Sequence, residues 1–95
     1  KGKGHGSINL ELHELAHSID YLVFHHIHAT PSFLTIWREE ANELFPHNDY
    51  FLDYPEEYFA EAFAYYYTDE TRADLKEKAP KTYEFIQQLT KRTRN

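Results

Sequence analysis

The chain lacks several residue types, and each absence limits what the protein can do. No cysteine occurs among its 95 residues, which excludes disulfides, thiol nucleophiles and thiolate metal ligands. Any bound metal must therefore use histidine, aspartate or glutamate. Only three glycines are present, all within residues 1–7, where we expect a flexible lead-in. Methionine is also absent, so the chain has no initiator residue and we expect a fragment or processed piece of a longer protein.

Positive charge and long apolar runs are scarce as well. Ten basic against 16 acidic residues give a net charge of −6, which argues against nucleic acid as a partner. No apolar run reaches the length of a membrane span, so no membrane partner is expected. Aromatic residues are abundant at 17% of the chain and can fill a small core. Together these features predict one small globular domain over residues 1–95.

Apolar periodicity and proline positions predict a mainly α protein with about five helices. Ser7 and Thr30 are suitable N-cap residues, and Pro31 suits the first position of a helix. Pro46 ends the second helix, and residues 47–53 are predicted to be a loop. No segment has the pattern of a strand. The predicted helices cover about residues 8–28, 31–45, 55–67, 69–78 and 80–92.

The first predicted helix carries the sequence His13-Glu14-Leu15-Ala16-His17. Residues four apart leave the same face of a helix, so the two imidazoles can occupy two corners of a tetrahedral Zn²⁺ site. Glu14 lies beside the first histidine and can act on a water at the open metal position. This pattern indicates a zinc-dependent hydrolase, provided that another element supplies a third ligand.

A third ligand is available on the predicted helix 55–67, where Glu57 and Glu61 lie four apart in a largely apolar stretch. Buried carboxylates need a positive partner, and a zinc ion with its histidines would provide one. Either glutamate can be the ligand, with the other orienting a zinc-bound ring. Asp20, three residues after His17, is a further candidate for that orienting role.

Peptide hydrolysis at such a site also needs a donor for the oxyanion, and Tyr50 and Tyr54 are both close to the third helix. Spacing does not choose between them. The cluster His25, His26 and His28 is a conceivable second metal site, although histidines at a helix end also suit the helix dipole. These alternatives stay open on the residues alone.

Three segments together resemble a known family. They are residues 9–20 (NLELHELAHSID), 54–67 (YPEEYFAEAFAYYY) and 79–83 (APKTY). They are similar to the bacterial Pro-Pro endopeptidases and, more distantly, to the catalytic domain of anthrax lethal factor. The resemblance implies the zinc-bearing helical half of a gluzincin-type metalloprotease. In that family an upstream part contains a small sheet that holds the peptide, and this part is not among the 95 residues.

The resemblance assigns roles residue by residue. It implies a zinc site whose ligands are His13, His17 and Glu57. Glu14 is then the general base, and Glu61 orients the ring of a zinc-bound histidine. Around the substrate it implies that Tyr50, seven residues before Glu57, is the oxyanion donor. It also implies that Glu56 pairs with a lysine on a loop over the substrate. His5 is either part of a flexible tail or a substrate contact.

The implied function is that of a secreted bacterial zinc endopeptidase, a monomer, which cuts between two prolines in Pro-rich segments of surface proteins. One alternative is a protease of the lethal-factor kind that cuts a host signalling protein. Another is an inactive, zinc-stabilised module that binds a Pro-rich peptide. Glu14 argues against the inactive module, because a structural zinc site needs no general base.

Overall fold

The structure, a computed structural model, describes residues 9–23 and 25–93. These residues form helices and no strand, which confirms the predicted helical class. None of the described helices is long and apolar enough to cross a membrane. In chain order the α-helices are α1 Leu10–Ser18, α2 Pro31–Leu44, α3 Asp49–Asp53, α4 Pro55–Tyr66, α5 Asp69–Lys78 and α6 Pro80–Thr93.

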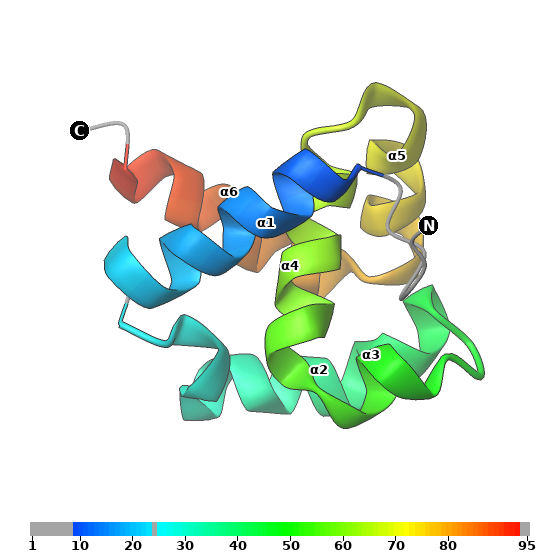
Figure 1. The fold of residues 1–95 in the computed structure, drawn as a ribbon. Coiled ribbons are helices and arrows are strands. Elements are labelled where there is room, and N and C mark those ends of the chain that lie inside the picture. The colour runs from blue at the N-terminus through cyan, green and yellow to red at the C-terminus, as the bar shows by residue number, and fades with distance from the viewer. Residues whose placement is uncertain (1–8, 24, 94–95) are drawn as a thin grey trace.

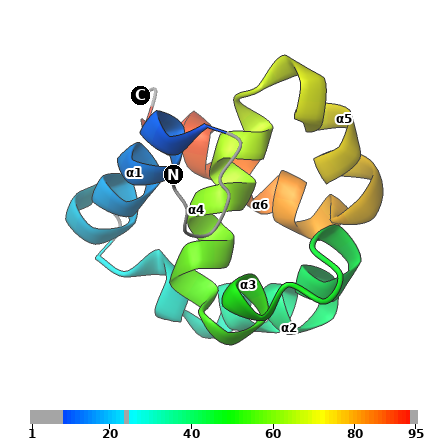
Figure 2. The same cartoon turned by 45° about the vertical axis from the view of Figure 1, so that its right-hand side comes forward.

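Helix α4 is the centre of the fold, and the other helices surround it (Figure 1). Seven consecutive residues of α4, 58–64, are buried, so this helix contributes core residues on every side. Helix α1 crosses α4, and Figure 2 shows α2 and α3 below the two helices. Fully buried alanines occur on both crossing helices, Ala16 on α1 and Ala60 on α4. Their short side chains allow the two backbones to approach closely, which brings the functional faces of α1 and α4 together.

Four of the five predicted helices are confirmed nearly at their predicted bounds, because proline and capping residues mark their starts. Thr30 accepts a hydrogen bond from the backbone of Phe33, and Pro31 occupies the first position of α2. Pro55 and Pro80 begin α4 and α6 in the same way.

The prediction of one continuous helix over residues 8–28 is wrong. Helix α1 starts at Leu10 with Asn9 as its cap, and a π-helical turn, Ile19–Val23, follows it. The chain then leaves helical geometry, because His25 and His26 have positive φ angles of 54° and 69°. A 3₁₀ turn, Ile27–Ala29, leads into α2. Ser7, the predicted cap, lies outside the described residues.

The prediction of a loop over residues 47–53 is also wrong, because this stretch contains α3. Phe51 is 2% exposed, and the indole N–H of Trp37 on α2 donates to its carbonyl at 3.0 Å. A helix of five residues is too short for apolar periodicity to reveal it; tertiary contacts with α2 and α4 hold it in place. Through these contacts α3 carries Tyr50 to the side of α4.

Candidate metal centre

Helix α1 presents His13 and His17 on the face that crosses α4. The two ring centroids are 4.9 Å apart, as expected for residues one helical turn apart. His13 is fully buried, whereas the side chain of His17 is 29% exposed. One ring is therefore held in the interior and the other lies at the edge of the solvent.

Glu57, in the first turn of α4, faces both rings. Its Oε1 atom lies 2.9 Å from Nε2 of His13 and 3.0 Å from Nε2 of His17. Ligand atoms of these three residues all lie within 4.8 Å of one another, and among the described residues this is the one group of three or more potential metal ligands. A tetrahedral ion at about 2.0 Å from each ligand separates neighbouring ligand atoms by about 3.3 Å. The distances from Glu57 to the two histidine nitrogens, 2.9 and 3.0 Å, are close to that value.

Glu61, one turn further along α4, lies behind His13. Its Oε1 atom is 2.8 Å from Nδ1 of His13, and its side chain is 2% exposed. A carboxylate can only accept hydrogen bonds, so Nδ1 of His13 carries the proton and donates a hydrogen bond to Glu61. The structure thus places Glu57 and Glu61 at opposite nitrogens of one ring, the arrangement that metal-binding histidines commonly show.

The chemistry of these atoms fits a cation. With Nδ1 of His13 protonated, Nε2 of the neutral ring has a lone pair, and it faces a carboxylate oxygen that also only accepts. Two acceptors at 2.9 Å need a proton or a metal ion between them. A set of two imidazoles and one carboxylate, with no thiolate, matches a catalytic zinc site of the His₂Glu type. The residues present therefore fit zinc.

The pKa directions agree with this arrangement. Burial opposes protonation of His13, but its hydrogen bonds to Glu61 and Glu57 outweigh burial and raise the pKa of His13 above 6.5. Burial also opposes ionisation of Glu57. Its hydrogen bond with His13 and the charge of His17 outweigh that effect, so the pKa of Glu57 falls below 4.5. A proton between His13 and Glu57 is thus stabilised at the place where a metal ion would bind, and a bound metal would replace it.

Tyr50, on α3, reaches the same carboxylate. Its hydroxyl is close enough to Glu57 for the two groups to shift each other's pKa. Burial, followed by the charge and hydrogen bond of Glu57, raises the pKa of Tyr50 to about 12. Tyr54 lies beside it, with ring centroids 5.7 Å apart, but its side chain is 50% exposed. Of the two candidate tyrosines, Tyr50 is the one that contacts the cluster.

The remaining predicted site residues lie around this cluster. Glu14 is exposed, and its charge contributes to the raised pKa of Tyr50. The charge of Glu56 acts on Tyr50 in the same way. His5 lies outside the described residues. The catalytic and substrate-binding roles of these groups stay predictions.

Asp20 is not brought to the metal-ligand histidines. Its buried carboxylate accepts hydrogen bonds from the backbone and the ring of His28. Asp20 lies in the π-helical turn that follows α1. His26 and His28 form an edge-to-face ring contact with centroids 5.7 Å apart. They are absent from the one group of potential metal ligands found among the described residues.

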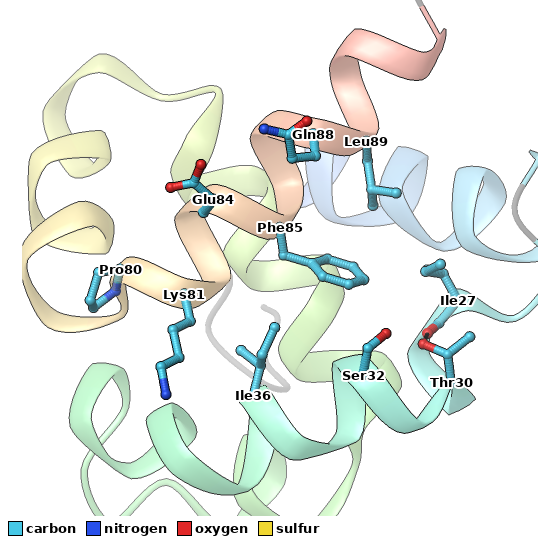
Figure 3. Close-up of a pocket in the computed structure, with 10 residues that line it drawn as sticks. All are labelled: Ile27, Thr30, Ser32, Ile36, Pro80, Lys81, Glu84, Phe85, Gln88 and Leu89. Atoms are coloured by element: carbon cyan, nitrogen blue, oxygen red, sulfur yellow. Dashed lines mark hydrogen bonds between the residues drawn. The ribbon is translucent and has the colours of Figure 1, made fainter.

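A cavity of about 800 Å³ lies elsewhere, between α2 and α6 (Figure 3). Ile27, Ile36, Phe85 and Leu89 give it apolar walls, and Lys81 and Glu84 are among its polar lining residues. None of the predicted site residues that the structure describes lines this cavity. It is therefore separate from the metal-ligand cluster.

Comparisons with known proteins identify relatives of this chain. Residues 1–89 match the family described as anthrax toxin lethal factor, N- and C-terminal domain. The Pro-Pro endopeptidase of Paenibacillus alvei is 48% identical over 90 residues, which cover 94% of this chain and 42% of that protein. The Pro-Pro endopeptidase of Clostridioides difficile is 50% identical over 92 residues, which cover 96% of this chain and 41% of that protein.

A solved structure of the Pro-Pro endopeptidase from Paenibacillus alvei matches the fold with a TM-score of 0.86 at 48% identity. The match covers 94% of this chain and 53% of that one. The chain thus spans about two fifths of the length of the two curated relatives. It is homologous to the Pro-Pro endopeptidases, and it belongs to the anthrax toxin lethal factor family.

Proposed function

We propose that this chain is the zinc-binding part of an endopeptidase that hydrolyses Pro-Pro bonds in Pro-rich segments of bacterial surface proteins. The observation that carries the proposal is the convergence of His13, His17 and Glu57, with Glu14 directly after the first histidine. Two relatives named Pro-Pro endopeptidase, at 48% and 50% identity, support the choice of bond.

Five residues of the chain would carry out the hydrolysis, each with its own role. His13, His17 and Glu57 would hold a zinc ion, which when bound lowers the pKa of a water and polarises the scissile carbonyl. Glu14 takes the proton from the attacking water and delivers it to the leaving nitrogen. Tyr50 donates its O–H to the developing oxyanion, since a phenol stays protonated at neutral pH.

The substrate follows from the same relatives. A Pro-rich segment is extended and already ordered, so it loses little conformational entropy on binding, and aromatic side chains suit it. Glu56, directly before Glu57 in the sequence, would pair with a lysine on a loop over the substrate, and His5 would contact the substrate. The protein acts as a monomer outside the bacterial cell, where surface proteins are accessible.

The test of this function uses a chimera, because the chain spans only 42% of the Paenibacillus alvei relative. The matching segment of that enzyme is replaced by this chain, and the chimera is incubated with peptides that carry a central Pro-Pro bond. We expect about one zinc per chimera and cleavage between the prolines. His13→Ala should remove the zinc, and Glu14→Gln should keep the zinc and abolish cleavage.

Two results would contradict the proposal. A folded, zinc-loaded chimera that binds the peptides without cleaving any of them would favour a peptide-binding module. Cleavage of other bonds only would favour a protease of the lethal-factor kind that acts on a host protein.

A further inference from the structure

A buried carboxylate lies far along the chain from the metal-ligand residues. Glu40, on α2, is 6% exposed and accepts three hydrogen bonds from the start of α6. The donors are the backbone N–H of Lys81 at 2.9 Å, and the backbone N–H and hydroxyl of Thr82, both at 2.8 Å. Helix α6 begins with Pro80, which has no N–H, and Ala79 before it has no capping side chain. A carboxylate from a different helix therefore caps α6.

The hydroxyl of Thr82 continues this cap into α4. It lies 2.8 Å from the hydroxyl of Tyr58, and both residues are fully buried. Thr82 has one O–H, which it donates to Glu40, so the O–H of Tyr58 must donate to Thr82. The result is a directed chain of hydrogen bonds from Tyr58 through Thr82 to Glu40, which links α4, α6 and α2.

Tyr58 directly follows Glu57 in the first turn of α4. This turn lacks a side-chain cap, because its N-cap residue, Tyr54, makes no such hydrogen bond. The ring of Tyr58 lies against the rings of Phe33 and Phe45, with centroids 6.1 and 5.8 Å away. Contacts between apolar rings are weakly directional, whereas the hydroxyl bond to Thr82 fixes a position and an angle. The hydroxyl therefore adds a directional restraint, beside the packing of α4, to the turn that carries Glu57.

We propose that the hydrogen-bond series Tyr58–Thr82–Glu40 positions the metal centre. It does so by setting the rotation of the first turn of α4. That rotation places Oε1 of Glu57 at 2.9 and 3.0 Å from the two histidine nitrogens at once. A small rotation of the turn would lengthen one of the two distances. The three residues touch neither the metal nor the substrate and act through Glu57. This inference rests on the zinc site of the proposed function.

The test measures zinc affinity by competition with a chromophoric chelator, together with the thermal midpoint of each variant. Thr82→Val keeps the shape of the side chain and removes the hydroxyl, and we expect zinc to bind about tenfold more weakly. Thr82→Ser restores the hydroxyl and should stay within about twofold of the unchanged chain. Tyr58→Phe removes the other hydroxyl of the pair and should weaken zinc binding in the same direction as Thr82→Val.

Ile86→Val is the matched control for loss of stability. Ile86 is fully buried on the same helix as Thr82, and the change removes one methylene without touching the hydrogen-bond chain. We expect a lower thermal midpoint with unchanged zinc affinity. Zinc binding that is equally weak in Ile86→Val, or unchanged in both Thr82→Val and Tyr58→Phe, would overturn the positioning role alone. An unchanged chain that binds no zinc would overturn the proposed function and this inference with it.

Discussion

Glu61 accepts a hydrogen bond from Nδ1 of His13 at 2.8 Å, and this contact determines which nitrogen of the ring faces Glu57. Without Glu61, the ring of His13 can take its other tautomer or rotate, and either change removes a metal-binding lone pair. Glu61, which lies outside the group of potential metal ligands, thus determines whether His13 can bind a metal.

The first prediction concerns this contact. Glu61→Ala should weaken zinc binding by about 10–100-fold, because the ring of His13 is no longer oriented. Glu61→Gln should have a smaller effect, since its amide oxygen can still accept from Nδ1. Isothermal titration of the metal-free variants with zinc measures both changes. Equal affinities for the unchanged chain and Glu61→Ala would show that the contact does not orient the ligand.

The second prediction concerns addition and removal of the metal. The proposed zinc site exists in the folded chain and not in the unfolded chain, so added zinc should raise the free energy of unfolding. The gain should be about 2.7 kcal/mol when free zinc is 100 times the dissociation constant. Urea unfolding with zinc and with a chelator measures it. In Glu57→Gln, zinc should raise the free energy of unfolding much less. His47→Ala changes an exposed histidine and should keep the full effect of zinc. The same effect in both variants would mean that the metal binds elsewhere.

The third prediction separates the two tyrosines that the sequence left open. Tyr50 is close enough to Glu57 for the two groups to shift each other's pKa, whereas Tyr54 lies beside Tyr50 and is 50% exposed. In the chimera, Tyr50→Phe should lower the cleavage rate by about 10²–10³-fold, the cost of one oxyanion donor. Zinc content should not change. Tyr54→Phe removes a hydroxyl from the neighbouring ring and is the matched control; a larger loss from Tyr54→Phe would reverse the assignment.

The sequence predicted those features that depend on local spacing. His13 and His17 share a helix face because they lie four apart, and the bounds of α2, α4, α5 and α6 follow proline and cap positions. The choice between Glu57 and Glu61 depended on how α4 is rotated against α1, which spacing within α4 cannot give. The resemblance to the Pro-Pro endopeptidases proposed Glu57 as the ligand.

Other features depended on tertiary contacts that no short pattern reveals. Asp20 pairs with His28 beyond the end of α1, and the link between Glu40 and Thr82 joins residues 42 apart in the sequence. Helix α3 has only five residues and owes its stability to contacts with α2 and α4. A single sequence shows which side chains are chemically able to pair, whereas the packing of the helices decides which of them meet.

The last prediction concerns alkaline pH and the buried hydroxyl of Tyr58. Burial raises the pKa of Tyr58 well above its usual 10.0, so the folded state holds this proton more tightly than the unfolded state does. The stability that this provides is complete below about pH 10, the unfolded pKa, and decreases as the pH rises towards the folded pKa. Above pH 10, one such group contributes a slope of about 1.4 kcal/mol per pH unit to the loss of stability. Urea unfolding between pH 8 and pH 11.5, read by circular dichroism, should show a slope at least this steep, because the pKa values of Tyr50 and Tyr65 are also raised. Tyr58→Phe should be less stable at pH 8, because a buried hydrogen bond is lost. Above pH 10 its stability should fall less steeply with pH, by the slope that corresponds to about one proton.

Tyr21→Phe is the matched control for loss of a tyrosine hydroxyl. Tyr21 is 61% exposed, so the change removes a hydroxyl without affecting the core and should leave the slope as it is. Identical slopes for Tyr58→Phe and the unchanged chain would mean that Tyr58 does not drive the alkaline transition.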